Sequence, residues 1–211
     1  MREKEITFEE KDYAAHIREV YETGASYVPD FLTPQALVYL QNLVGELEPF
    51  IVQARNNTST FYVADWDIAD VSLKFRMGSA TTALTDLIKA EGREFKSLSD
   101  WYVTDPFVLR YYDDTLVMPH RDHEEYQQIG VTVSIAGLAD FHTHNEEDGK
   151  PVNTWRVKPG DAVFLRMSGF NPNVPYDREI FHSVGAPLTS EPRTSIAFRK
   201  YIEPPKPTQK K

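Results

Sequence analysis

The chain has 211 residues, 41% of them hydrophobic and 26% charged, which is enough for one domain with a full core and excludes the composition of a disordered protein. It contains no cysteine, which excludes disulfides, zinc–thiolate sites and thiol nucleophiles. The formal net charge of −9 disfavours attraction to a nucleic-acid polymer or to an anionic membrane.

The first part of the chain, residues 1–98, reads as helical. Apolar residues recur every three or four positions in Glu9–Thr23 and again in Ser79–Glu91. Thr33 followed by Pro34 is typical of an N-cap and first helical position, and a wide apolar stripe follows. A stripe of that width needs a large partner, so we expect these helices to support a sheet.

Residues 56–78 lose the helical period and have two interpretations. They form one or two strands that cover the sheet, or they form a lid that reads the substrate. Trp66 and Arg76 lie in this stretch and are candidate substrate contacts, able to stack on or clamp a planar group.

Residues 99–203 consist of short β-rich runs separated by turn residues, which is typical of an antiparallel sandwich or barrel. We expect an α+β protein with a mainly β core, a double-stranded β-helix (jelly roll) flanked by the N-terminal helices, folded as one unit. The expected strands are Phe107–Tyr112, Val131–Ala136, Ala139–His142, Thr154–Val157, Ala162–Leu165, Glu179–Val184 and Arg193–Tyr201.

The two ends of the chain carry no strong signal. Residues 204–211 are rich in proline and lysine and read as a flexible tail. Met1–Glu5 lacks the apolar stretch of a signal peptide, and no apolar run is long enough to cross a bilayer. We therefore expect a soluble, intracellular protein of the cytoplasm.

The segment Met118–Asp122 carries the chemistry. His120 and Asp122 are two positions apart, so in extended chain they share a face and can hold one metal ion. His182 supplies a second imidazole inside a short apolar run. Two histidines and one carboxylate leave three open positions on an octahedral metal, the arrangement that non-haem Fe(II) oxygenases use.

The predicted strand Arg193–Tyr201 adds a polar face. Alternation places Arg193, Ser195 and Arg199 on one side and leaves apolar residues for the core on the other. A guanidinium binds a carboxylate bidentately, so Arg193 can hold the far end of a dicarboxylate, with the Ser195 hydroxyl beside it. The alternative is an edge strand with two arginines in solvent.

Other residues offer competing or supporting roles. His142 and His144 share a strand face and form a second candidate metal pair, with only Glu146 or Asp148 as a third ligand. The loop of residues 168–176 runs into the strand of His182 and is expected to overhang the metal. Its aromatic residues are candidate substrate contacts, although a purely structural loop is the alternative: Phe170 and Tyr176.

From Phe107 to Tyr201 the chain resembles the Fe(II)/2-oxoglutarate-dependent dioxygenases, and within them the AlkB-like branch most. The more specific mark is the pair of arginines, Arg193 and Arg199, that closes a strand after the distal histidine. The segments that carry the resemblance are Arg110-Tyr111, His120-Arg121-Asp122, Val133-Ser134-Ile135-Ala136-Gly137-Leu138, Gly160-Asp161-Ala162-Val163-Phe164-Leu165, Phe181-His182 and Pro192-Arg193 through Phe198-Arg199.

The resemblance implies that the three candidate ligands bind Fe(II), with 2-oxoglutarate as cosubstrate and O2 as oxidant. Tyr111 and Arg193 would hold the far carboxylate of 2-oxoglutarate, and Arg199 would reach the carboxylate near the metal. Asp122 favours hydroxylation or oxidative demethylation, because halogenating relatives lack this carboxylate.

The substrate class stays open at this level. The AlkB-like similarity suggests an alkylated nucleobase, whereas the acidic charge favours a small molecule, a free nucleotide or a protein side chain. From another class of function, the alternative is a non-catalytic jelly-roll protein that binds a metal or a ligand. Such a protein would be expected to lack one of the ligands or the arginine, and the sequence keeps them all.

Overall fold

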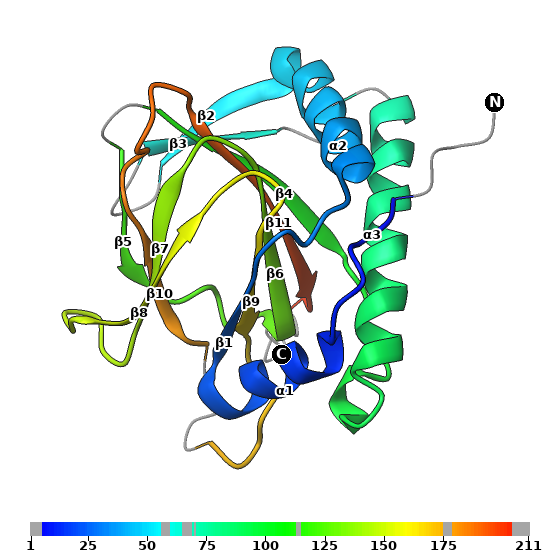
Figure 1. Ribbon diagram of the computed structural model, residues 1–211, viewed down its shortest axis with the longest axis vertical. Coiled ribbons are helices and arrows are strands. Elements are labelled where there is room, and N and C mark those ends of the chain that lie inside the picture. The colour runs from blue at the N-terminus through cyan, green and yellow to red at the C-terminus, as the bar shows by residue number, and fades with distance from the viewer. Residues whose placement is uncertain are drawn as a thin grey trace, which may run out of the picture.

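The computed structural model describes residues 6–55, 60–64, 69, 71–112, 115–174 and 179–203. Two antiparallel sheets face each other, and three helices pack on the outer side of the larger one (Figure 1). The helices are α1 (Tyr13–Thr23), α2 (Pro34–Glu46) and α3 (Val71–Glu91), with single 3-10 turns at η1 (Glu48–Phe50) and η2 (Lys96–Leu98).

The larger sheet has seven strands and the smaller has four. The order of the first is β1 (Ala25–Val28), β9 (Ala162–Arg166), β6 (Tyr126–Ala136), β11 (Arg193–Tyr201), β4 (Asp105–Tyr111), β3 (Thr60–Ala64) and β2 (Ile51–Arg55). The order of the second is β5 (Val117–His120), β10 (Phe181–Val184), β7 (Ala139–His144) and β8 (Pro151–Val157). This arrangement confirms the predicted jelly-roll core with flanking helices.

The larger sheet separates two hydrophobic clusters. On its outer face, Ile196 and Phe198 of β11 pack with Ile17, Leu40 and Leu84 of the three helices. Between the two sheets lies a smaller cluster, in which Phe141 and Val184 of the smaller sheet are members. Fewer apolar side chains therefore lie between the two sheets than between the larger sheet and the helices, and buried polar side chains lie there as well.

Strand β11 shows how alternation divides these two environments. Thr194, Ile196 and Phe198 face the helices, as the sequence predicts, while Arg193 and Arg199 point into the space between the sheets. Both arginines are only 4% exposed, so the alternative of an edge strand with arginines in solvent is wrong.

The structure differs from the sequence prediction in the first hundred residues. Strand β1 pairs with β9, and β3 pairs with β2 and β4, so this part of the chain extends the sheet as well as supporting it. Helix α3 starts at Val71, eight residues before the expected start. The exposed side chains of Val71 and Phe75 obscured a period that continues through Leu73 and Met77.

The stretch 56–78 is accordingly strand at Thr60–Ala64 and helix from Val71 onward. Residues 56–59, 65–68 and 70 lie outside the described residues, so the lid interpretation is not tested there. No helix in the described part of the chain is both long and apolar enough to span a membrane.

Candidate metal centre

The three predicted ligands meet at one point. His120 and His182 are directly opposite each other in the antiparallel pair β5–β10, with ring centroids 4.4 Å apart. The Asp122 Oδ1 atom lies 3.9 Å from His120 Nε2 and 3.8 Å from His182 Nε2. All ligand atoms lie within 4.8 Å of one another, and this is the one such group found among the described residues.

The backbone fixes which imidazole nitrogen faces the metal position. His120 Nδ1 lies 2.9 Å from the Met118 carbonyl oxygen, and His182 Nδ1 lies 3.1 Å from the Ile180 carbonyl oxygen. Because a carbonyl only accepts, each Nδ1 carries the proton and each Nε2 keeps its lone pair for a metal. The ring of Phe141 stacks on His182 with centroids 5.7 Å apart, which restrains the ring further.

Asp122 is held ionised by its neighbours. Arg199 Nε donates to Asp122 Oδ2 over 2.8 Å, which leaves Oδ1 turned toward the two histidines. Burial alone would raise the pKa of the carboxyl, but the charge of Arg199 above all, with the neighbouring imidazoles of His182 and His120, holds the pKa of Asp122 well below its ordinary value. The carboxylate is thus ready to bind a cation.

Arg199 differs from the role that the resemblance implied. Its Nη1 atom donates to the Val131 and Phe198 carbonyl oxygens, and its Nη2 atom donates to the Thr132 hydroxyl. A Cβ at Gly130 would lie 2.8 Å from Arg199 Nη1, so this glycine leaves room for the guanidinium. Arg199 therefore orients a candidate metal ligand, and the contact with the cosubstrate that the resemblance implies stays a prediction.

The pKa of His182 is lowered to about 4 in the metal-free protein, first by burial and then by the neighbouring His120. In the unfolded chain a histidine titrates near its ordinary value of about 6.5. The unfolded state therefore binds more protons between these values, and stability falls as the pH drops from about 6.5 to 4.

We expect the metal-free protein to lose about 2 kcal/mol of stability from this group between pH 7 and pH 5. The variant His182→Gln should lose correspondingly less over the same interval, because glutamine does not titrate. Urea unfolding midpoints at the two pH values, with a chelator present, measure both changes. Equal losses of stability in the wild type and in His182→Gln would show that folding does not lower the pKa of His182.

A group of buried polar side chains suited to a carboxylate lies along β11 from Arg199. Arg193 is 4% exposed and forms no ion pair with any described residue. Tyr111 lies opposite Arg193 in β4, and the Arg193 Cζ atom is 5.6 Å from the centre of the Tyr111 ring. Burial without a carboxylate partner lowers the pKa of Arg193. The hydroxyl oxygens of Ser195 and Ser134, cross-strand neighbours, are buried without a hydrogen-bond partner among the described residues.

These groups fit an anionic cosubstrate. A buried guanidinium and orphaned hydroxyl groups are costly unless a ligand pairs with them, and a carboxylate accepts from both. Ser134 was not singled out from the sequence. The alternation of small and polar residues at Gly130, Thr132 and Ser134 in β6 is the signal that points to this inner face.

Of the four candidate substrate residues, the structure describes two, Arg76 and Phe170. Trp66 and Tyr176 lie outside the described residues. Arg76 forms a two-pronged ion pair with Glu46 across α3 and α2, at 3.0 and 2.5 Å, on the helical side of the larger sheet. Phe170 is fully buried and packs against Tyr21 and Phe95, each at 5.4 Å, so it is a core residue and not part of a substrate surface.

The competing pair is not assembled into a site. His144 uses both ring nitrogens, with the Gly149 carbonyl oxygen at 2.9 Å and the Ser183 hydroxyl at 2.8 Å. His142 Nδ1 lies 2.9 Å from the Thr154 hydroxyl. No third ligand joins them in the described part of the chain, and the competing metal pair is therefore wrong there.

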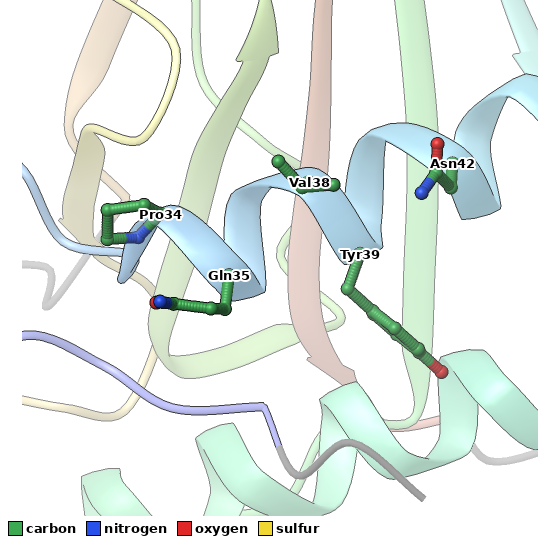
Figure 2. Close-up of a pocket in the computed structure, with 5 residues that line it drawn as sticks. All are labelled: Pro34, Gln35, Val38, Tyr39 and Asn42. Atoms are coloured by element: carbon green, nitrogen blue, oxygen red, sulfur yellow. The ribbon is translucent and has the colours of Figure 1, made fainter.

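A second surface feature lies away from this centre. Side chains of α2 line a depression of about 390 Å³ on the outer, helical side of the molecule. Figure 2 shows how these side chains lie along the helix. The residues are Pro34, Gln35, Val38, Tyr39 and Asn42. None of them is a candidate metal ligand or lies on the inner face of either sheet, so the chemistry is not located there.

Comparison with known proteins identifies the fold. No family model and no curated protein matches the chain. Solved structures do match: a prolyl-4-hydroxylase from Pseudomonas putida is 16% identical, with 91% of this chain and 100% of that chain covered and a TM-score of 0.60. The epimerase SnoN, in complex with Fe3+, alpha ketoglutarate and nogalamycin RO, is 18% identical, with 88% and 80% covered and a TM-score of 0.59.

An AlkB-like protein is also among the similar structures. OsALKBH1 is 14% identical, with 84% of this chain and 98% of that chain covered and a TM-score of 0.54. The similarity covers between 84% and 91% of this chain in the three cases. This chain therefore has the fold of the 2-oxoglutarate- and Fe(II)-dependent oxygenases, AlkB-like proteins among them.

Proposed function

We propose that the chain is a dioxygenase dependent on Fe(II) and 2-oxoglutarate, which hydroxylates or oxidatively demethylates a C–H substrate. One observation carries the proposal. In this fold, His120, Asp122 and His182 converge on one point, and a buried arginine without an acidic partner, Arg193, lines the same inner face. A buried guanidinium without an acidic partner is costly unless an anionic ligand pairs with it.

Each residue has a defined task in this proposal. The two Nε2 atoms and the Asp122 carboxylate hold Fe(II), and Arg199 keeps that carboxylate oriented. Arg193, with the hydroxyl groups of Tyr111 and Ser195, holds the far carboxylate of 2-oxoglutarate. When bound, iron and 2-oxoglutarate supply the oxidising chemistry, in which 2-oxoglutarate, O2 and a C–H substrate become succinate, CO2 and an alcohol.

The substrate is proposed to be a small molecule or a nucleobase, free or in a nucleotide. A nucleic-acid polymer is disfavoured by the net charge of −9, because phosphate contacts dominate the affinity for such polymers. A protein side chain is the remaining class. The cytoplasmic location expected from the sequence stays a prediction.

Formation of succinate tests the activity. With Fe(II), ascorbate, O2 and 2-oxoglutarate, the purified protein should form succinate slowly on its own and clearly faster when its substrate is added. Mass spectrometry of succinate measures both rates, and candidate pools of methylated nucleosides, metabolites and single-stranded methylated DNA compare the substrate classes.

The alternative is a jelly-roll protein that binds the metal without catalysis. It predicts that Fe(II) binds while no succinate forms under any of these conditions, which would rule the enzyme out. If only the methylated DNA raised the rate, the preference for a small substrate would be wrong while the activity would stand.

A further inference from the structure

A second polar pocket lies behind the strands that carry the candidate metal ligands. Its volume is about 150 Å³, and none of the three ligands lines it. Phe181 precedes His182 in β10 and therefore points to the opposite face, where it pairs with His144 of β7. The residues that matter for its chemistry are Arg121, Phe181, Glu179, Arg166, His144 and Asn145.

Arg121 brings an unused positive charge to this pocket. Its guanidinium carbon lies 4.0 Å above the centre of the Phe181 ring, which fixes the plane of the group. The Nε atom is buried without a hydrogen-bond partner, and the side chain forms no ion pair with any of the described residues. A guanidinium that is held in one plane and has no carboxylate partner can bind the carboxylate of a ligand.

Glu179 brings an unused negative charge to the same pocket. The residue is 6% exposed, and its Oε1 atom accepts from the Ser168 hydroxyl over 2.5 Å. It forms no ion pair with a basic side chain in the described ranges. A buried carboxylate with one neutral donor is under-compensated, so a ligand that donates to it from a cationic group would stabilise it.

Two other polar side chains of the pocket, Arg166 and His144, also have hydrogen-bond partners in the protein. Arg166 Nη1 donates to the Tyr21 carbonyl oxygen, at 3.4 Å, in the last turn of α1. His144 Nδ1 donates to the Gly149 carbonyl oxygen, and its Nε2 lies 2.8 Å from the Ser183 hydroxyl, so both ring nitrogens have partners. The pocket thus offers a ligand the cation of Arg121 and the carboxylate of Glu179, with the second guanidinium of Arg166 beside them.

We propose that this pocket binds the head group of a free α-amino acid, with the carboxylate on Arg121 and the ammonium group toward Glu179. A simple anion would be repelled by Glu179 and a simple amine by Arg121, whereas a zwitterion pairs with both. The volume suits a small molecule or one end of a larger one. The site is separate from the iron chemistry and does not depend on it.

Three small probes test the charge pattern on the full chain. L-alanine carries both charges, propionate lacks the ammonium group and ethylamine lacks the carboxylate. Titrations followed by heteronuclear NMR should show saturable binding of L-alanine, with propionate and ethylamine at least roughly tenfold weaker, as expected for losing one charged hydrogen bond.

Variants place the binding in this pocket. Arg121→Gln and Glu179→Gln should each weaken L-alanine binding by at least roughly tenfold. Arg156→Gln, on an exposed ion pair with Asp140, should leave it unchanged. Unfolding midpoints identify any variant that fails to fold, and Arg121→Lys then serves as the milder replacement.

The following results would overturn the proposal. If propionate bound as tightly as L-alanine, the pocket would be a plain anion site. If L-alanine gave no saturable shift with the wild-type chain, or bound both glutamine variants unchanged, the pocket would not recognise an amino acid.

Discussion

Replacing His182 with alanine should abolish the weak visible absorption band that Fe(II) and 2-oxoglutarate together give under anaerobic conditions. His182 is the more buried of the two imidazoles, at 7% side-chain exposure against 30% for His120, and its Nε2 atom faces Asp122. Losing a group that only hydrogen-bonds a metal ligand costs about 10- to 100-fold in metal affinity. Because His182→Ala removes a ligand itself, we expect the affinity for Fe(II) to fall by about 100-fold or more.

The matched control for this experiment is His142→Ala. His142 lies on the neighbouring strand β7, opposite Ser183, and belongs to no metal-binding group among the described residues. Its variant should keep the band at full intensity. If His142→Ala lost the band while His182→Ala kept it, the metal centre would have to be placed on the other face of the smaller sheet.

Replacing Arg193 with methionine should weaken the binding of 2-oxoglutarate and should stabilise the protein when 2-oxoglutarate is absent. The KM for 2-oxoglutarate should rise roughly 30-fold or more, since truncating one partner of a buried charge pair costs about 2–5 kcal/mol. Without 2-oxoglutarate the variant should unfold at a higher temperature than the wild type, because the buried guanidinium has no ion-pair partner in the described structure. The rate of succinate formation at varied 2-oxoglutarate concentration measures the KM, and thermal unfolding with and without 2-oxoglutarate measures the stability.

The control here is Arg156→Met, which removes an exposed arginine paired with Asp140. It should change neither the KM nor the stabilisation by 2-oxoglutarate. An Arg193→Met variant with unchanged KM would show that the cosubstrate carboxylate binds elsewhere. A variant less stable than the wild type in both conditions would show that Arg193 is paired within the protein.

The strand Arg193–Tyr201 shows how far local pattern carries. Its bounds and both of its faces were predicted correctly, because side chains of a strand alternate wherever the strand lies. The start of α3 was wrong, because exposed apolar residues such as Phe75 blur a helical period. The prediction that Phe170 contacts the substrate was also wrong, because a loop sequence does not show that this side chain packs against Tyr21 of α1 and Phe95.

What the sequence alone determined is the set of ligand types and the side of each strand on which they lie. The tertiary structure decided which of them meet: the register of β5 with β10 sets His120 against His182, and Arg199 reaches Asp122 across 77 residues of chain. It also placed Arg121 and Glu179 in one pocket. Alternation is a property of neighbouring residues, whereas distances between strands depend on pairing and packing of the whole chain.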